Sequence, residues 1–448
     1  MGLGFLCYNI CMGRNLSSLL ERTLDSSRLE VLHLLAYQAS MLRIPLYLVG
    51  GVVRDILVGR PVKDFDLVLE GNSAEFAEYI VRKFGGKILV HSRFGSATWM
   101  LNESTYKRLK VPAFQISDTP LSFDLISARS ETYEYPGALP TVKRSNIDDD
   151  LRRRDFSINA MAVRLDGDNF GNLYDPLDGQ LDLGGKLIRV LHNKSFVDDP
   201  TRIFRAVRYA GRYEFEIAPE TLKLVNDEAR KVLAQLSGER IRHEFDLIFE
   251  EGHPTTILEM LNELNVLAIV HPPLRMADSG RLAAMVDKAE DGFGDFVVPD
   301  ILSFRQTLGW VLYLLNLPVV DIDAVAQRLG FPVLLTKAAR GGSSLIKELP
   351  SVKDWKPSQW TFYLDGISLL SVYAVYLVTK HESLLEYLTL WRTIKPYTSG
   401  YTLQQSGLAP GPQYKEILTR LRMAWLDGEV QTEDEEVKLL NVMVEGKL

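Results

Sequence analysis

The stretch that decides the fold runs from residue 48 to residue 68 and reads LVGGVVRD at 48–55 and GRPVKDFDLV at 59–68. An apolar run ends at Gly50 and Gly51 and a helical pattern follows, which predicts a strand, a tight turn and a helix. Glycine lets the backbone approach a phosphate closely, and the first turn of a helix has N–H groups without intrahelical partners. Because most turns of this kind serve only as turns, the stretch alone leaves phosphate binding open.

The second half of this stretch carries two acids, Asp64 and Asp66, on either side of Phe65. On a strand, residues i and i+2 face the same way, so we expect both carboxylates on one side and Phe65 in the core. Carboxylates at this spacing suit Mg²⁺, which keeps open positions for substrate phosphates. Asp124, in a further predicted strand, is the candidate third acid of a two-metal site. A solvated strand end is the competing interpretation for each of these acids.

The elements around this stretch predict an α/β or α+β head followed by a long helical region. The strands expected in the head are 46–49, 65–69, 96–100, 123–128 and 160–164, with a helix at 73–84 and a candidate further strand at 188–191. Apolar residues recur at helical spacing over residues 12–42 and over most of the chain after Pro200. The helices expected next are 200–213, 219–229, 238–249 and 255–264.

The composition is that of an ordinary globular protein, with 46% hydrophobic and 24% charged residues. Its net charge of -7 supplies no global field that attracts nucleic acid, so a polyanion must be bound by local basic patches. Two cysteines, Cys7 and Cys11, exclude a disulfide framework, and the histidines lack the spacing of a zinc site. The longest apolar runs, at 308–320 and 367–378, are shorter than the roughly 20 residues that span a bilayer. We therefore expect a cytoplasmic location.

A basic triplet followed by an acid occupies residues 152–155 and precedes FSINAM at 156–161. Arginine forks bind phosphate through two hydrogen bonds, so this run is a candidate site for a triphosphate and a ribose hydroxyl. Basic triplets are common, and a charged, solvated helix end is the competing interpretation.

The run FVDDPTRIFRAVR at 196–208 predicts a helix whose N-cap is Asp199 and whose first residue is Pro200. Arg202, Arg205 and Arg208 share one face of this helix, and apolar residues fill the opposite face. A surface helix normally intersperses acids for pairing at i,i+4, and this row contains none before position 214. An anion-binding face is therefore the better interpretation.

Together these motifs resemble the class II tRNA nucleotidyltransferase/poly(A) polymerase family, the bacterial-type branch of the polymerase-β-like nucleotidyltransferases. The resemblance covers residues 47–164, continues through 175–183 and 188–191 to 217, and reaches the GERI run at 238–241. It implies an α+β fold, in which a polymerase-β-like nucleotidyltransferase head is followed by an all-helical neck, body and tail. The domains expected are an N-terminal helical segment at 1–42, the catalytic head at 43–172, a neck for base recognition and RNA binding at 173–265, and a tRNA-binding body and tail at 266–448.

The resemblance implies Mg²⁺-dependent transfer of a nucleoside monophosphate from CTP or ATP to the 3′-hydroxyl of tRNA, with release of pyrophosphate. The implied metal ligands are Asp64 and Asp66; the implied nucleotide contacts are Gly51, Arg54, Arg154, Asp155, Arg205 and Arg208; the implied protein template for the base is Asp199 with Arg202. A carboxylate accepts hydrogen bonds from the exocyclic amine of cytosine or adenine, and an arginine donates to the ring nitrogen or carbonyl. Uracil and guanine present a carbonyl oxygen where the amine would lie, so the pair should repel UTP and GTP.

Two departures from the family pattern leave the extent of addition open. Asp198 stands where the family usually has glutamate, and the connection at 129–140 lacks the Gly, Asp and Arg richness of many full CCA-adding members. Full CCA addition, CC addition and A addition all remain alternatives. A poly(A) polymerase is a further alternative, although the acidic segment at 427–436 replaces the basic extension expected of one. The alternative of another class is a catalytically inactive RNA-binding protein on the same scaffold.

The expected partner is the 3′ end of tRNA, with no membrane and no stable protein partner implied. In this family the tail is expected to reach the tRNA elbow. Residues 415–422, which follow the turn at Gly411 and Pro412, are the candidate contact, and a solvated helix face is the competing interpretation.

Overall fold

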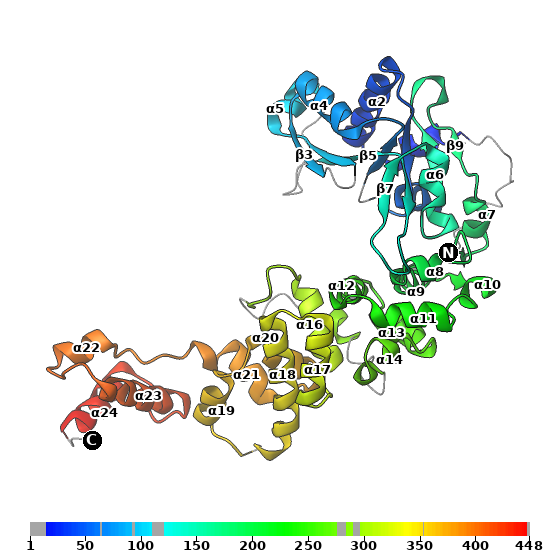
Figure 1. Ribbon diagram of the computed structural model, residues 1–448. Helices are drawn as coiled ribbons and strands as arrows, with labels where there is room; N and C mark the ends of the chain where they lie inside the picture. Colours follow the sequence, from blue (N-terminus) through cyan, green and yellow to red (C-terminus); the bar gives the residue numbers. More distant parts are fainter. Residues whose placement is uncertain are drawn as a thin grey trace, which may run out of the picture. The chain divides into compact units, whose positions relative to one another are not determined.

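The computed structural model describes residues 15–62, 65–91, 95–109, 121–275, 284–289, 296–352 and 354–445. The chain divides into two compact units, residues 1–236 and residues 237–448 (Figure 1). The first unit contains the β-sheet, and the described part of the second is helical, which confirms the expected α+β class. The finer domain boundaries expected from the sequence stay predictions.

A seven-stranded mixed sheet forms the centre of the first unit. Its strands, in spatial order, are β3 (Lys87–His91), β4 (Ser96–Met100), β5 (Ser122–Ser127), β2 (Asp66–Leu69), β1 (Leu46–Val49), β8 (Ala162–Arg164) and β9 (Leu173–Tyr174). Each strand expected in the head is present, within two residues at its ends. The sequence did not predict β3, because this edge strand exposes both Leu89 and Val90 and so lacks the alternation that marks a half-buried strand.

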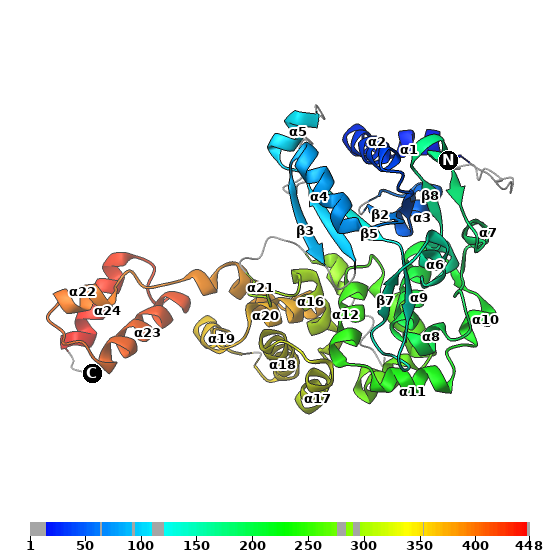
Figure 2. The same cartoon turned by 45° about the horizontal axis from the view of Figure 1, so that its top comes forward.

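Some helices of the first unit begin at polar side chains that cap them. α4 (Ser73–Phe84) is capped by Asn72, whose side chain accepts a hydrogen bond from the backbone N–H of Ala74. It packs against β3, β4 and β5 and buries Phe76 and Ile80 there (Figure 2). The other helices of this part are α1 (Ser17–Thr23), α2 (Ser26–Met41), α3 (Gly51–Val58), α5 (Glu103–Leu109), α6 (Ile147–Arg152) and α7 (Gly179–Gly184).

A hairpin occupies the segment that the sequence suggested as a loop at 129–140. β6 (Arg129–Thr132) pairs antiparallel with β7 (Thr141–Arg144), so only the residues between them form the connection. β6 follows β5 after a single residue and runs towards α8 (Ser195–Asp198) and α9 (Thr201–Tyr213) (Figure 1). At the hairpin tip, the N–H of Gly137 donates to the backbone carbonyls of Val197 and Asp198, at 3.2 Å each. The tip is therefore attached to the segment that leads into α9.

The region after α9 departs from the prediction in one place. The single helix expected at 219–229 is wrong: α10 (Pro219–Leu222) ends early, and α11 (Asp227–Gln235) begins anew. The physical reason is Asn226, whose side chain caps the second helix by accepting from the N–H of Ala229. The candidate strand at 188–191 overlaps the observed strand only at Ile188: β10 (Leu187–Ile188) pairs in parallel with β11 (Glu216–Ile217), and Val190 forms an isolated bridge with Phe156.

The second unit buries aromatic side chains between its helices, with Phe245, Phe249, Trp310 and Tyr313 in mutual ring contact. A smaller apolar cluster around Leu403 lies nearer the C-terminus. No helix among the described residues is both long enough and apolar enough to cross a membrane. Among the described residues of this unit, the α-helices are α12 (Gly238–Phe249), α13 (Pro254–Glu263), α14 (Val266–Val270), α16 (Phe304–Leu314), α17 (Val319–Leu329), α18 (Val333–Glu348), α19 (Pro357–Leu364), α20 (Leu369–Thr379), α21 (Glu382–Thr389), α22 (Gly400–Gln405), α23 (Pro412–Leu426) and α24 (Glu433–Glu445).

Candidate active site

One edge of the central sheet gathers the acids that the sequence singled out. Asp66 begins β2, Asp124 lies near the start of β5, and the two are register partners in parallel strands. β1 runs antiparallel to β2, so its last residue, Val49, and the glycine turn after it reach the same edge. Asp64 lies outside the described residues. The sheet thus places two acids and the turn side by side, although Asp124 lies 58 positions after Asp66 in the sequence.

The two described acids are held with their carboxylates away from the core. Phe65 and Leu67, on either side of Asp66, are buried, while both acids are only partly buried. The Oγ1 of Thr98, on β4, donates to Oδ1 of Asp124 at 2.6 Å. The described residues contain no cluster of three or more potential metal-ligating side chains, so these two carboxylates are the donor set that the structure itself offers here.

The glycine turn is shaped for close contact with an arginine. Gly50 has φ +74°, a region that L side chains rarely adopt, and its N–H donates to the carbonyl of Met161 at 3.0 Å. A Cβ at Gly50 would lie 2.4 Å from Nη1 of Arg154, so only glycine leaves room for that guanidinium. Gly51 follows as the first residue of α3.

Arg54, an implied nucleotide contact, is buried within the protein with 3% of its surface exposed. Its guanidinium donates to Asp55 at 3.0 and 3.1 Å and to Oδ1 of Asn159 at 2.5 Å. It also stacks on the ring of Tyr213, 4.6 Å from the ring centroid. The observed contacts of Arg54 therefore join α3 to α9 and to the segment before β8, and a contact with a nucleotide stays a prediction.

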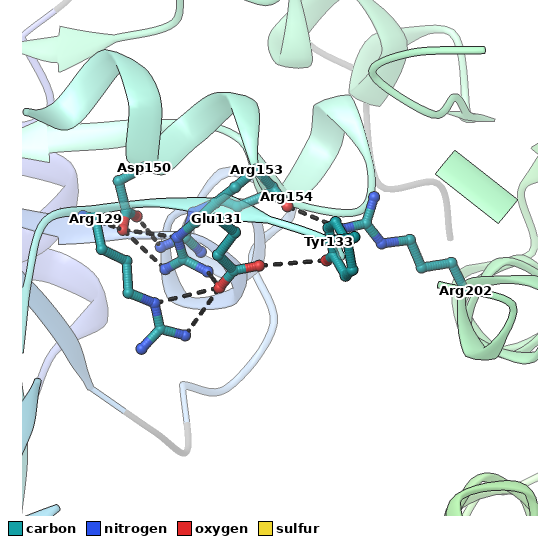
Figure 3. Close-up of polar contacts among 7 residues, drawn as sticks. All are labelled: Arg129, Glu131, Tyr133, Asp150, Arg153, Arg154 and Arg202. Carbon is teal, nitrogen blue, oxygen red and sulfur yellow. Dashed lines mark hydrogen bonds and ion pairs between the residues drawn. The ribbon is translucent and has the colours of Figure 1, made fainter. Parts of the chain in front are cut away.

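A buried carboxylate forms ion pairs with two arginines of the triplet (Figure 3). Asp150, fully buried at the end of α6, accepts from Nε and Nη2 of Arg153 at 2.9 and 2.8 Å and from Nη2 of Arg154 at 2.9 Å. Burial alone would raise the pKa of Asp150, but Arg154 and Arg153 outweigh it and hold the pKa below its usual value. Arg153 also donates to Glu131 of β6 at 3.0 Å.

Arg154 is the member of the triplet that reaches the glycine turn. Its Nε is buried and has no hydrogen-bond partner among the described residues. No role of Asp150 or Glu131 was predicted from the sequence. The signal for Asp150 was present in its spacing, because an acid three and four residues before two arginines on a helix faces both of them.

Asp155 is paired with Arg205 of α9. Its Oδ2 accepts from Nε and Nη2 of Arg205 at 2.8 and 2.6 Å, while Oδ1 accepts from Asn159 and the backbone of Phe156. Burial favours the neutral acid, yet Arg205 and Asn159 lower the pKa of Asp155 to about 2. The acid that balances the arginine row of α9 thus comes from a residue 50 positions earlier. The implied contact of Asp155 with a ribose stays a prediction.

The base-reading pair suggested by the sequence lies at the start of α9. Oδ1 of Asp199 accepts from the backbone N–H and the hydroxyl of Thr201, at 3.1 and 2.7 Å. The helix begins at Thr201 with Pro200 as its N-cap residue, so the predicted N-cap at Asp199 lies one residue too early. Arg202 is 6% exposed, and its guanidinium donates to Ser195 and to the carbonyl of Arg153, both at 2.9 Å. It also donates to the hydroxyl of Tyr133 at 3.4 Å (Figure 3). Burial and the neighbouring Arg202, which act in opposite directions, leave the pKa of Tyr133 raised to about 12.

Arg208 and Asp198 complete the set of residues around α9. Arg208 is 4% exposed and lies over the ring of Tyr209, 5.2 Å from its centroid. The carboxylate of Asp198 lies 3.9 Å from Nδ1 of His192. The row of arginines predicted from the helical pattern is present on α9. Its arginines contact buried groups of the protein itself as well as facing the candidate active site.

The candidate tRNA-binding segment at 415–422 lies on α23. Within it, Arg422 donates to Asp365 at 2.6 Å and to the carbonyl of Ile394, and Arg420 is paired with Glu429. Lys415 is exposed. Internal packing therefore uses the arginines of this segment, and a contact with tRNA stays a prediction.

Comparison with known families places two regions of the chain. Residues 46–189 match the poly A polymerase head domain, and residues 214–277 match a domain described as a probable RNA and SrmB-binding site of polymerase A. The first match contains the sheet edge, the glycine turn and the arginine triplet.

Individual relatives match most of the chain. The A-adding tRNA nucleotidyltransferase of Halalkalibacterium halodurans is 33% identical over 94% of this chain and 94% of its own. That of Geobacter sulfurreducens is 32% identical over 95% of this chain and 48% of its own. A CCA-adding enzyme structure in an apo form superimposes with a TM-score of 0.79, at 29% identity over 98% of this chain and 100% of its own. The Thermotoga maritima CCA-adding enzyme complexed with tRNA gives a TM-score of 0.73, at 27% identity over 97% of this chain and 100% of its own.

Proposed function

The chain belongs to the tRNA nucleotidyltransferase/poly(A) polymerase family, and on that premise we propose that it transfers AMP from ATP to the 3′ end of a tRNA that already ends in CC. The resemblance seen in the sequence is thereby confirmed at the level of the family. Two relatives that are 33% and 32% identical over 94% and 95% of this chain carry the name A-adding, which supports A addition, while two CCA-adding enzyme structures that match the chain are 29% and 27% identical to it. Its similarity to tRNA-processing enzymes supports a cytoplasmic location.

The structural observation that supports the proposal most is one continuous charge network (Figure 3). It runs from Arg154 at the glycine turn through Asp150 to Arg153, whose backbone carbonyl accepts from Arg202 on α9. Arg154, the proposed phosphate-binding arginine, and Arg202, the proposed base-reading arginine, are thus connected by one set of ion pairs and hydrogen bonds. A nucleotide bound there would have its triphosphate near the sheet edge and its base near α9.

The acids at the sheet edge fit a divalent cation. Carboxylate oxygens are the hard ligands that such ions prefer, and Asp66 and Asp124 supply them from adjacent strands. Enzymes of this family generally depend on a divalent metal, and we assign Mg²⁺ as the ion and Asp64 as a further ligand. When bound, Mg²⁺ supplies charge that lowers the pKa of the RNA 3′-hydroxyl and stabilises the departing pyrophosphate.

The protein's own groups orient the nucleotide. Arg154 is available to donate to the triphosphate through its unpartnered Nε, because Asp150 already fixes the other side of its guanidinium. Asp199 accepts from the exocyclic amine of adenine, while Arg202 donates to the adjacent ring nitrogen. The Arg205 guanidinium, positioned by Asp155, adds positive charge near the sugar and phosphates.

The deciding experiment uses three tRNA substrates that end at the discriminator base, after C, or after CC. Each is incubated with Mg²⁺ and either ATP or CTP, and the products are resolved at single-nucleotide length. We expect one AMP added to the tRNA ending in CC and no use of CTP. Efficient CMP addition to the shorter substrates would replace A addition by CC or CCA addition, and a ladder of adenylates would identify a poly(A) polymerase. No incorporation on any substrate, in a protein that binds tRNA, would favour the inactive RNA-binding alternative.

A further inference from the structure

The guanidinium of Arg202 is held by three acceptors from three different parts of the first unit. Nη1 donates to the hydroxyl of Ser195, which is fully buried at the start of α8. Nη2 donates to the carbonyl of Arg153 and to the hydroxyl of Tyr133, which follows β6. These contacts define a cradle around Arg202, formed by Ser195, Tyr133 and the Arg153 carbonyl.

The cradle leaves a defined part of Arg202 for a ligand. A guanidinium has five N–H bonds in a fixed plane, and the cradle uses three of them. Among the described residues, none accepts from Nε or from the second N–H of Nη1. Because the guanidinium is planar and rigid, fixing one side of the fork fixes the direction of the remaining donors.

The supports of the cradle are themselves immobilised. Arg153 is anchored by Asp150 and Glu131, at 2.8 to 3.0 Å. The hydroxyl of Tyr133 donates to the other carboxylate oxygen of Glu131 at 3.4 Å, so Glu131 braces both (Figure 3). The hairpin that carries Tyr133 is attached at its tip to the backbone before α9.

We propose that Ser195 and Tyr133 are specificity-positioning residues, which hold the free donors of Arg202 in one orientation and thereby set which base the site accepts. This inference rests on the proposed function in taking Arg202 as the residue that reads the base. Neither side chain needs to touch the nucleotide. Ser195 contributes more, because its hydrogen bond is 2.9 Å long and fully buried, whereas that of Tyr133 is 3.4 Å long.

The test compares Ser195→Ala and Tyr133→Phe, each of which removes one hydroxyl and keeps the rest of the side chain. Two matched variants serve as controls. Ser157→Ala removes a buried serine hydroxyl that donates to Asp182, and Tyr135→Phe alters an exposed tyrosine of the same hairpin connection. The readout is the ratio of affinities for ATP, CTP, GTP and UTP, measured by calorimetry on the full chain with Mg²⁺ and without tRNA.

We expect wild type to prefer ATP and Ser195→Ala to lose about 10-fold of that preference, the size of one hydrogen bond to a charged group. Tyr133→Phe should lose about threefold, as its longer bond is weaker. Both controls should keep the wild-type ratios. An affinity loss equal for all four nucleotides, unchanged ratios, or a wild type without preference would each overturn the cradle's role.

The same variants in the tRNA assay separate this inference from the proposed function. If wild type binds ATP selectively and Ser195→Ala relaxes that selectivity, the cradle stands even if the transfer reaction proves to be CCA addition. If wild type adds AMP to tRNA and both variants retain full discrimination in kcat/KM, the proposed function stands and the cradle is wrong.

Discussion

The acids at the sheet edge and the arginines around α9 are held in opposite ways. Asp66 and Asp124 stand partly exposed near the starts of β2 and β5, where they are register partners and Thr98 of the neighbouring strand donates to Asp124. Arg202 and Arg208 are almost fully buried, and side chains from distant segments hold Arg202. The difference teaches that strand register already brings two acids from distant parts of the sequence side by side. A base-reading arginine needs a network, because its long side chain has to be fixed in one orientation.

The largest expected effect comes from the sheet edge. Asp66→Asn removes a charged ligand from a partly exposed position, so nucleotide incorporation should fall about 10³-fold or more while the melting temperature stays near that of wild type. Asp168→Asn, an exposed acid of the same unit, is the matched control and should change neither. Near-normal turnover of Asp66→Asn would show that this acid is not a metal ligand.

The next effect tests the arginine side of the comparison. Arg202→Leu removes the donor and should reduce discrimination between nucleotides by about 10- to 150-fold, the range of one charged hydrogen bond of 1.5–3 kcal/mol. The measurement is relative kcat/KM for the four nucleotides on a tRNA lacking its terminal residue. A uniform loss of activity with the preference intact would mean that Arg202 grips phosphate or structure instead.

The buried pair of Asp155 and Arg205 should carry stability that depends on pH. Because Asp155 has a pKa of about 2 in the folded protein against 3.8 for the ordinary group, its ionised form stabilises the fold. This contribution, about 2 kcal/mol, is fully present above pH 4 and is lost as the pH falls through 2. Asp155→Asn should therefore lower the urea midpoint at pH 6, and the gap to wild type should close between pH 4 and pH 2. A gap of constant size over that range would contradict the buried Asp155–Arg205 pair.

The smallest expected effect arises at the glycine turn, where Gly50 contacts Arg154. Gly50→Ala places a Cβ against Arg154, whereas Gly59→Ala meets no atom within 4 Å, and both glycines have positive φ. Each change should cost about 1 kcal/mol of stability through backbone strain. Only Gly50→Ala should also raise the KM for ATP, by severalfold, because it displaces a phosphate-binding arginine. Equal KM values in the two variants would show that Arg154 does not contact the nucleotide.

Much of the fold could be predicted because short-range physics determines it. β1 and β4 have the predicted bounds, and α4 and α12 do as well, since alternation and helical spacing report burial directly. Edge strand β3 and the hairpin of β6 and β7 escaped prediction, because neither has a clean buried face. The single helix expected at 219–229 was wrong because the side chain of Asn226 caps a new helix within that range.

The sequence by itself determined the acids, the glycine turn and the arginine row, because these depend on residue type and on spacing within one strand, turn or helix. Only the tertiary structure decided that Asp155 takes Arg205 and that Glu131 of the hairpin takes Arg153. It also decided that Ser195, Tyr133 and a backbone carbonyl hold Arg202. The physical reason is that a buried charge requires partners in three dimensions, and those partners come from segments whose approach no local pattern encodes.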